Sequence, residues 1–496
     1  MIGRSAGSAG TSDTGTSSAG TSSAATSSAA TSSAGPAARP SARLAWLDAL
    51  RGLAALAVVF DHASMLVVTS THSFLYQWFN FGQYGVFVFF LVSGYIIPAS
   101  LERKGSIRGF WISRGFRLYP LYVLAIIASG VGYELGYGTL RGAQHHPVQS
   151  AAADLLMLPN VLGGPNVPNV TWTLSYEMVF YLLLAALFSV RAHRASGGYA
   201  VACAIVVVTL GGILPMGALN NGIGPLGPRD IPIIADALIL AGIGLAVSGR
   251  RMRGGSWLAA GVGLLLLTIN QDHYPLPWSG YTILALMFTG TVIYRAESGQ
   301  VARWKAAVIA VVVLAMTVGG GLWHGAQRPD WGTAGAQWQW QWMTSLVGAA
   351  LTFGVGLLLR ERRVPRILAW LGMISYSVYL LHPLILDAFR DVPTLHHASR
   401  GLVVQLPLAA GLIAVVIATS AATYYLVEKP MQRLGHKVAK RWDRPQTRSG
   451  TGSDTASGAG DVAADGMAVG TVAVGAQAAR SASINKTVAG GSGGSP

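Results

Sequence analysis

Residues 46–68, WLDALRGLAALAVVFDHASMLVV, form an apolar run that contains two residues able to do chemistry, Arg51 and His62. About 20 apolar residues make a helix that crosses a membrane, and ionisable side chains inside such a helix are costly enough to indicate function. The two positions are 11 residues apart, which is three turns plus about 20°, so they share one helix face, about 16 Å apart. Because an imidazole titrates near physiological pH, His62 is a candidate general base for a hydroxyl.

Both residues also have a purely structural interpretation. Arg51 lies five residues from Trp46, so its guanidinium group can extend to the membrane interface, or Asp48 can neutralise it. His62 lies deeper and has no such route, although a hydrogen-bonded packing histidine is an alternative to a catalytic one.

Three further charged residues accompany this pair. Glu177 lies in the apolar segment TWTLSYEMVFYLL, where a carboxylate either orients His62, binds an acceptor hydroxyl or caps a buried network. Arg114 and Arg117 lie three residues apart in the basic segment ERKGSIRGFWISRGFRLYP. At that spacing two guanidinium groups can clamp phosphates, and the alternative is a basic segment that only sets membrane topology.

Composition predicts the elements that position these residues. The 496 residues are 52% hydrophobic and 11% charged, far below the roughly 25% charged of soluble domains. We therefore expect an all-α, polytopic membrane helix bundle of about 10–12 transmembrane helices, residing in the cell membrane. The short run at 256–270 is either tilted or re-entrant. The candidate spans are 46–68, 84–101, 118–137, 172–190, 199–217, 231–248, 256–270, 278–294, 306–323, 342–359, 367–388 and 402–427.

The charges between the spans predict the orientation. Alternate joints carry 23 Lys and Arg in total, and the remaining joints carry 5. Since basic joints stay on the cytoplasmic side, both termini are expected to be cytoplasmic, with Arg114 and Arg117 at the cytoplasmic face and His62 and Glu177 toward the outer side. The net charge of +15 is thus spread over many joints, which favours a lipid bilayer over nucleic acid as the partner.

The two ends differ from the centre. Residues 1–44 are rich in Ser, Thr and Ala, and residues 445–496 are rich in Gly, Ala and Ser. Neither can bury a core, so we expect disordered tails around a membrane domain at 45–444. The single cysteine, Cys203, excludes an intramolecular disulfide and a cysteine metal cage, and no metal site is expected.

Six segments together resemble the acyltransferase-3 family of integral-membrane O-acyltransferases, of the stand-alone type without an SGNH hydrolase domain. In chain order they are LDALRGLAALAVVFDH, YGVFVFFLVSGYII, FWISRGFRLYPLY, TWTLSYEMVFYL, SYSVYLLHP and YYLVEKP. The resemblance implies transfer of an acyl group, commonly acetyl, from cytoplasmic acyl-CoA to a hydroxyl of a sugar, a glycan or a macrolide-like acceptor.

The resemblance also implies roles for the residues that match the family motifs. Arg51 and His62 match the arginine and histidine of the first span, Arg114 and Arg117 match the R-x-x-R of the cytoplasmic side, and Glu177 matches the acidic position of W-T-L-x-x-E. We expect His62, Glu177 and Arg51 to be catalytic and the two arginines of the basic segment to hold the CoA phosphates. A polytopic transporter or flippase of a glycan or metabolite is the alternative, although the chain has no visible inverted repeat.

Overall fold

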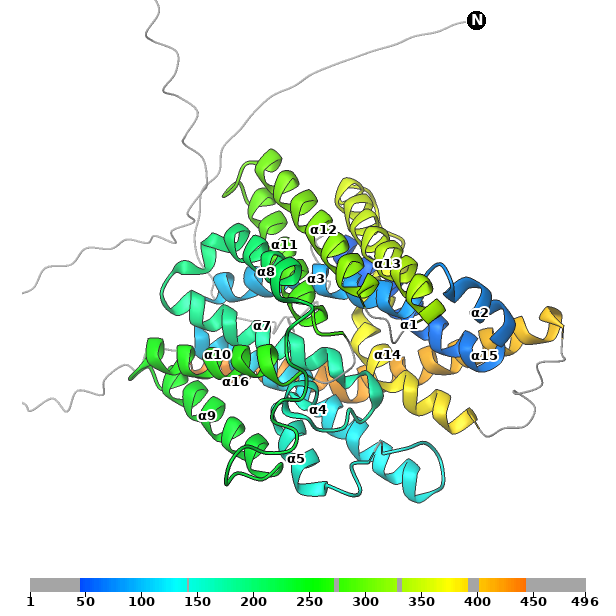
Figure 1. Ribbon diagram of the computed structural model, residues 1–496, viewed down its shortest axis with the longest axis horizontal. Coiled ribbons are helices and arrows are strands. Elements are labelled where there is room, and N and C mark those ends of the chain that lie inside the picture. The colour runs from blue at the N-terminus through cyan, green and yellow to red at the C-terminus, as the bar shows by residue number, and fades with distance from the viewer. Residues whose placement is uncertain (1–44, 141, 272–275, 328–331, 391–400, 443–496) are drawn as a thin grey trace, which may run out of the picture. The chain divides into compact units, whose positions relative to one another are not determined.

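The computed structural model describes residues 45–140, 142–271, 276–327, 332–390 and 401–442, so the predicted tails at 1–44 and 445–496 lie outside the described residues. Helices account for nearly all regular structure in this part of the chain (Figure 1). Short 3₁₀ turns (η1, η2) and a π-helix (η4) interrupt them. The elements are α1 Ala45–Val67, α2 Thr69–Tyr76, α3 Phe81–Lys104, α4 Ile107–Glu134, α5 Pro147–Leu155, α6 Pro159–Leu162, η1 Asn169–Thr171, α7 Trp172–Ser189, η2 Ala192–Ala195, α8 Ser196–Leu210, α9 Asp230–Val247, α10 Met252–Ile269, α11 Ser279–Glu297, α12 Arg303–Ala326, α13 Gly332–Leu358, α14 Arg366–Arg390, α15 Leu402–Thr423, η4 Tyr424–Glu428 and α16 Lys429–Trp442.

Eleven helical segments in the described residues are long and apolar enough to cross a membrane, so the protein is a multi-pass membrane protein. This confirms the predicted all-α polytopic bundle, and every predicted span falls on a helix. The short run at 256–270 belongs to α10, which begins earlier, at Met252, and is itself one of the eleven. Which side of the membrane the termini face stays a prediction.

Helix α11 is the predicted span that is not among the eleven. Its sequence contains several threonines, and 16 of its 19 residues are buried. It packs against α3, α8, α12 and α7. Because protein rather than lipid surrounds α11, its side chains need not be uniformly apolar.

The helices that carry the predicted site residues approach each other closely at glycines. Helix α1 makes its most extensive contact with α14, and a Cβ added to Gly52 would lie 2.9 Å from the backbone nitrogen of Gly372. A Cβ on Gly372 itself would collide with the carbonyl oxygen of Asp48. Small residues allow helix backbones to meet in a membrane protein, so this crossing fixes the position of α14 against α1.

The turn between α3 and α4 sets the position of the two arginines of the basic segment. Helix α3 ends at Gly105, which has a left-handed backbone (φ 64°), and the side chain of Ser106 caps α4 by accepting a hydrogen bond from Gly109 N at 3.0 Å. Helix α4 therefore begins at Ile107, and Arg114 and Arg117 lie well inside a helix rather than in a loop.

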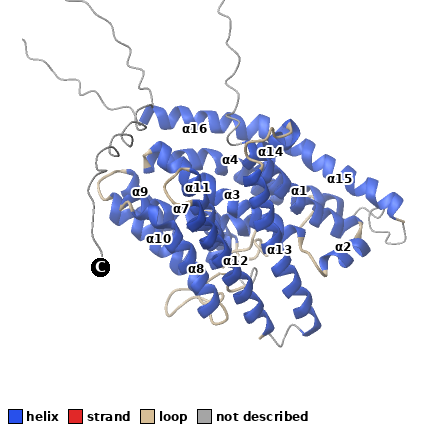
Figure 2. Cartoon of the chain, turned by 90° about the horizontal axis from the view of Figure 1, so that it is seen from above, coloured by secondary structure: helices blue, strands red, loops and turns tan. Residues whose placement is uncertain are grey.

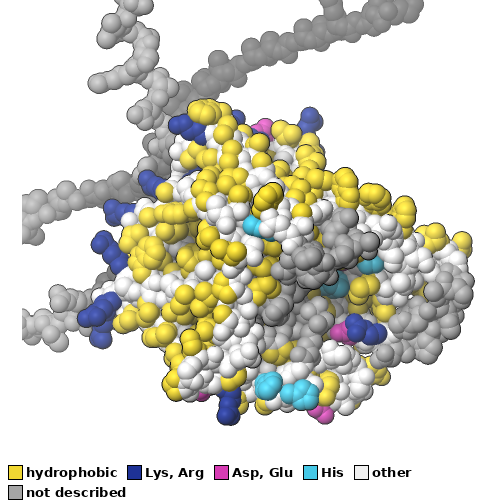
Figure 3. All heavy atoms as spheres, viewed as in Figure 1, with side chains coloured by type: hydrophobic (Ala, Val, Ile, Leu, Met, Phe, Trp, Pro, Cys, Tyr) yellow, Lys and Arg dark blue, Asp and Glu magenta, His cyan; other side chains and the backbone are white. Residues whose placement is uncertain are grey.

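Helix α16 runs across the ends of other helices, as Figure 2 shows. It is strongly amphipathic and packs on α4, where Gly435 lies against Phe116. In Figure 3, most of the visible Lys and Arg side chains gather at the edge of the molecule, and hydrophobic side chains cover much of the surface between them. This separation is typical of a protein with an apolar membrane belt and a charged rim.

Candidate active site

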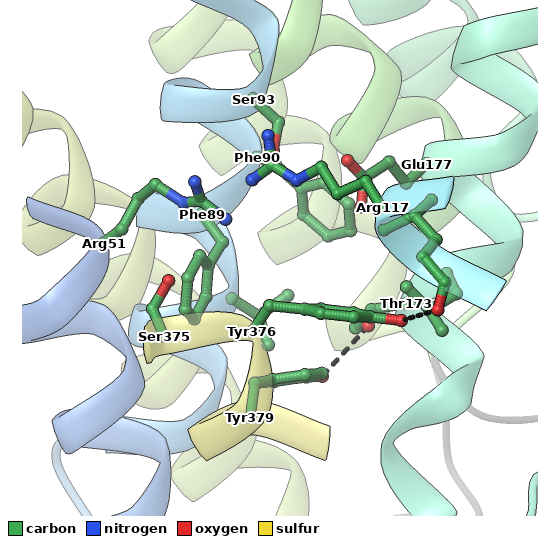
Figure 4. Close-up of a pocket in the computed structure, with 13 residues that line it drawn as sticks. Arg51, Phe89, Phe90, Ser93, Arg117, Thr173, Glu177, Ser375, Tyr376 and Tyr379 are labelled. Carbon is green, nitrogen blue, oxygen red and sulfur yellow. Dashed lines mark hydrogen bonds between the residues drawn. The ribbon is translucent and has the colours of Figure 1, made fainter. Parts of the chain in front are cut away.

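Arg51, Arg117 and Glu177 line one small cavity of about 60 Å³ in the middle of the helix bundle, which we call the charged cavity. Helices α1, α4 and α7 supply these three residues, and α3 and α14 complete the wall. In Figure 4, Arg51 and Arg117 extend from opposite sides toward the same space, and Glu177 lies beside Arg117. The remaining lining residues are Val86, Phe89, Phe90, Ser93, Leu118, Thr173, Leu174, Ser375, Tyr376 and Tyr379.

The charges at this cavity compensate one another in part. The Arg51 guanidinium interacts electrostatically with the carboxylates of Asp48, Glu177 and Glu428 and with the second cation, Arg117. Glu428 also accepts a hydrogen bond from Ser377 at 2.8 Å. Opposite charges nearby reduce the free-energy cost of burying a charged group. Two guanidinium groups that share a low-dielectric space can stabilise negative charge that develops on an oxygen atom.

Arg114 has different surroundings from Arg117. Its side chain is buried, and its guanidinium carbon lies 5.5 Å from the ring centre of Phe110 and 5.2 Å from that of Tyr181. Tyr181 in turn donates a short hydrogen bond to Glu177. Arg114 is not among the residues that line the charged cavity. It therefore supports the wall of that cavity through aromatic contacts.

His62 lines a second and much larger cavity of about 990 Å³, which we call the histidine cavity. Its volume is at the upper end of the range of small-molecule sites, about 300–1,000 Å³. Its walls combine apolar side chains with many hydrogen-bonding groups. The polar lining residues are Asp61, His62, Thr69, His72, Tyr76, Asn80, Gln83, Asn166, Asn169, Trp172, Ser279, Tyr379, Asp387 and Arg390.

The hydrogen bond of the His62 ring determines which nitrogen can act as a base. Nδ1 lies 3.0 Å from the carbonyl oxygen of Val58, one turn earlier on α1. Since a carbonyl oxygen only accepts hydrogen bonds, Nδ1 is the donor to it, and in the neutral ring the lone pair is on Nε2. His62 thus has the tautomer that a general base acting through Nε2 requires.

Asp61 and α2 form the wall next to His62. Asp61 Oδ1 lies 3.6 Å from His72 Nε2, and the His72 ring stacks on Tyr76 with ring centres 5.1 Å apart. Burial, with a smaller contribution from the Asp61 carboxylate, raises the pKa of Tyr76, so this phenol stays protonated as a hydrogen-bond donor. This wall therefore presents a carboxylate, an imidazole and an aromatic face to the histidine cavity.

The two cavities adjoin at Val86 and Tyr379, which line both of them. The Tyr379 hydroxyl accepts a hydrogen bond from Thr173 at 3.0 Å, which joins α14 to α7 at this point (Figure 4). The two cavities are therefore neighbours within the helix bundle.

The predicted site residues are thus distributed over two spaces. Arg51, Arg117 and Glu177 share the charged cavity, and His62 lies at the neighbouring one. The observed partner that orients the His62 ring is the Val58 carbonyl, whereas Glu177 binds Tyr181 and does not line the histidine cavity. Within the described residues no three His, Cys, Asp or Glu side chains are grouped so that they could hold a metal ion.

Sequence reasoning missed several residues that the fold brings to this region. They are Asp61, His72 and Tyr76 beside His62, and Tyr379 between the cavities. His382 of α14 also lies in this region, and its ring centre is 5.0 Å from that of His62. Tyr379 and His382 belong to the segment SYSVYLLHP, in which one apolar helix carries several hydroxyls and a histidine. That polar stripe was a usable signal.

Comparison with known proteins gives three findings. The sequence model of a family described as "Acyltransferase domain" matches residues 44–427. The chain is similar to "Acyltransferase MdmB" of Streptomyces mycarofaciens, 33% identical over 150 residues, which are 28% of this chain and 38% of that protein. It is also similar to "Nodulation protein 10" of Rhizobium leguminosarum bv. viciae, 28% identical over 188 residues, which are 32% of this chain and 48% of that protein. Each similarity spans less than half of the curated relative. No solved structure matches the chain.

Proposed function

Because the chain belongs to this acyltransferase family, we propose that it is a membrane O-acyltransferase that moves an acyl group from acyl-CoA to a hydroxyl of a sugar, glycan or macrolide-like acceptor. The observation that carries the proposal is the pair of adjoining cavities. One presents two guanidinium groups, and the other presents an imidazole with a free Nε2. These are the two groups that acyl transfer to a hydroxyl needs, an oxyanion stabiliser and a general base.

In the proposed reaction, the thioester end of the donor occupies the charged cavity, and the acceptor hydroxyl enters the histidine cavity. His62 Nε2 takes the hydroxyl proton while the hydroxyl oxygen attacks the thioester carbonyl. Arg51 and Arg117 stabilise the resulting oxyanion. The carbon–sulfur bond then breaks, and the thiolate of CoA leaves and receives the proton from His62. Transfer through an acyl-histidine on His62 is a variant with the same balance of atoms.

The charge of the joints supports entry of the donor from the basic side. Helix α16 and the basic joints form a cationic rim, and CoA carries several phosphate groups. We assign this rim to the cytoplasmic side. The charged cavity, at about 60 Å³, holds only a few heavy atoms, which favours acetyl or another short acyl group. Arg114 then acts behind Tyr181 and Glu177, and Arg117 faces the donor.

The experiment that tests the proposal is release of free thiol by the purified protein in lipid, with a panel of acyl-CoAs and pooled hydroxyl acceptors. We expect acceptor-dependent release by the native protein, and loss of that release in His62→Gln and Arg117→Ala. His324→Gln is the matched control, because His324 is a buried histidine on α12 that bonds Val207 O and lines neither cavity. Folded protein that releases no thiol with any donor would contradict the proposal, and movement of the acceptor across vesicles would then indicate a transporter.

A further inference from the structure

Helix α16 carries basic side chains along one side. At 3.6 residues per turn, five of its residues fall within about 100° of one another around the helix axis. We call the surface that they form the basic face, and its residues are Lys429, Arg433, His436, Lys437 and Lys440. All of them except Lys429 are exposed. Helix α16 itself contains no acidic residue, so no side chain of this helix neutralises the basic face.

The other sides of α16 show which way the basic face points. Gly435 and Ala439 are buried, and Gly435 lies against Phe116 of α4. Met431 and Trp442 are exposed apolar side chains, and they lie roughly opposite the basic face. Helix α16 runs across the ends of other helices (Figure 2), and the apolar side of such an interfacial helix faces the hydrocarbon of the bilayer. The basic face is therefore turned away from the hydrocarbon and toward water.

The basic face begins close to the charged cavity. Glu428, the residue before α16, accepts a hydrogen bond at 2.8 Å from Ser377 of α14, and Ser375 of the same helix lines that cavity. From Lys429 to Lys440 the helix then rises about 16 Å, at 1.5 Å per residue. The row of cations thus starts beside the space assigned to the thioester and leads away from it.

The phosphates of acyl-CoA need cations at such a distance. In CoA the pantetheine arm separates the thiol from the pyrophosphate and the 3′-phosphate. Arg114 is buried against Phe110 and Tyr181, and Arg117 lines the charged cavity, where the thioester is placed. Neither arginine is therefore available to the phosphates at the far end of the arm. Exposed ammonium and guanidinium groups donate charge-assisted hydrogen bonds to phosphate oxygens, and the basic face presents both kinds.

We propose that the basic face of α16 binds the pyrophosphate and the 3′-phosphate of acyl-CoA, while the pantetheine arm extends from it to the thioester in the charged cavity. Different elements thus hold the two ends of the donor, since α1, α4 and α7 supply the charged side chains around the thioester and α16 holds the nucleotide. Anionic lipid headgroups also carry phosphate, but the orientation of the basic face toward water favours the donor. This inference rests on the proposed acyl transfer.

A site for the nucleotide end predicts that a variant discriminates between two donors. Acetyl-CoA and S-acetylpantetheine have the same thioester, but only acetyl-CoA carries phosphates. In the double variant Lys437→Gln/Lys440→Gln, KM for acetyl-CoA should rise by about 10-fold or more, because two charge-assisted contacts are lost. The kcat should stay near the native value, since contacts remote from the reacting carbonyl are equal in the ground state and the transition state. For S-acetylpantetheine, kcat/KM should not change.

The test measures kcat and KM for both donors with the native protein, the double variant and a matched control. The control is Arg250→Gln/Arg253→Gln, which removes two exposed basic side chains from the turn between α9 and α10. Each protein is assayed in phosphatidylcholine membranes with and without phosphatidylglycerol, and thermal unfolding shows that each is folded. The ratio of kcat/KM for acetyl-CoA to that for S-acetylpantetheine should fall about 10-fold in the double variant in both membranes, and the control should keep the native ratio.

Three results would overturn the inference. The first is a native ratio in the double variant, and the second is an equal fall of the ratio in the control, which would assign the effect to the charge of the whole rim. The third is a loss with both donors that appears only with phosphatidylglycerol, which would assign the basic face to anionic lipid. Native protein without acceptor-dependent thiol release from either donor would instead contradict the proposed function itself, so the two failures are distinguishable.

Discussion

Arg114 and Arg117 lie three residues apart on α4, yet Arg117 lines the charged cavity and Arg114 packs between the rings of Phe110 and Tyr181. This difference predicts different consequences of substitution. Arg117→Ala should reduce kcat/KM for acyl-CoA by at least about 10-fold with little change in stability, since it removes a charge worth a few kcal/mol to the reaction. Arg114→Ala should mainly lower the thermal stability, because it removes two cation–π contacts of about 0.5–2 kcal/mol each.

Measuring kcat/KM for acyl-CoA and the unfolding temperature of both variants in the same lipid checks these two expectations. Equal increases in KM for the donor, with equal stability, would instead favour the phosphate clamp by both arginines that the R-x-x-R spacing predicts.

The example of α4 shows what could be predicted from the sequence. Apolar runs of sufficient length predicted all eleven helical segments that could cross a membrane, because crossing a bilayer imposes a composition on each helix separately. They could not predict which neighbour each arginine meets. Two residues at i and i+3 share a face only to within about 60°, and the aromatic side chains of α4 and α7 decide the rest. The contact between His62 and His382 likewise depends on α1 packing against α14, far along the chain, and no local pattern encodes it.

The crossing of α1 and α14 predicts a second result. Gly372→Ala would place a methyl group against the carbonyl oxygen of Asp48, so the two helices must separate. We expect acyl transfer to fall by about 10-fold or more, since displacements near 1 Å cost that much in positioning. Gly354→Ala on α13 is the control, because no atom lies within 4 Å of its added Cβ. Activity assays of both variants check this, and a fully active Gly372→Ala would show that the helix spacing does not position the site.

A third prediction concerns stability away from the site. Arg295 on α11 is 1% exposed and donates to Glu102 at 2.8 Å and to the carbonyl oxygen of His193 at 2.7 Å. Arg295→Ala leaves the Glu102 carboxylate without this partner, and loss of one member of a buried pair costs about 3–5 kcal/mol. The unfolding temperature should therefore fall sharply. Arg303, which is 76% exposed and lies 3.8 Å from Glu297, offers the comparison. Arg303→Ala should change that temperature little, because its guanidinium is exposed to solvent and Glu297 keeps Arg360 at 2.7 Å as a partner. Similar effects of both substitutions would refute this distinction.

The pH dependence of stability gives a fourth prediction. Burial raises the pKa of Asp154 on α5 from 3.8 to about 7, and the hydrogen bond donated by Tyr122 at 2.8 Å opposes that shift. Between about pH 4 and pH 7 the unfolded chain therefore binds fewer protons than the folded one. The contribution of Asp154 to stability is complete below about pH 4 and is lost as the pH rises to about 7, by up to about 1.4 kcal/mol per pH unit.

Unfolding temperatures of the native protein and of Asp154→Asn from pH 5 to pH 8 measure this contribution. The carboxamide cannot ionise, so the native protein should lose more stability than the variant as the pH rises. Parallel curves for the two proteins would show that Asp154 does not titrate in this range.

The last prediction concerns the boundary between the two cavities. Val86 is 4% exposed and lines both, so a larger side chain at this position would occupy the boundary at which, in the proposed reaction, the hydroxyl oxygen reaches the thioester. Val86→Phe should leave the Kd for acyl-CoA unchanged and reduce transfer to the acceptor by at least about 10-fold, because near-attack geometry accounts for much of such a rate.

A larger side chain in a packed helix bundle lowers the stability of the fold by about 1–3 kcal/mol, so the control variant must introduce the same larger side chain at another buried position. Val92→Phe provides it, since Val92 is buried on the same helix, α3, and lines neither cavity. Donor binding and acyl transfer measured on both variants separate a blocked passage from a disturbed helix. If Val92→Phe loses transfer as completely as Val86→Phe, the two cavities do not exchange the acyl group at this boundary.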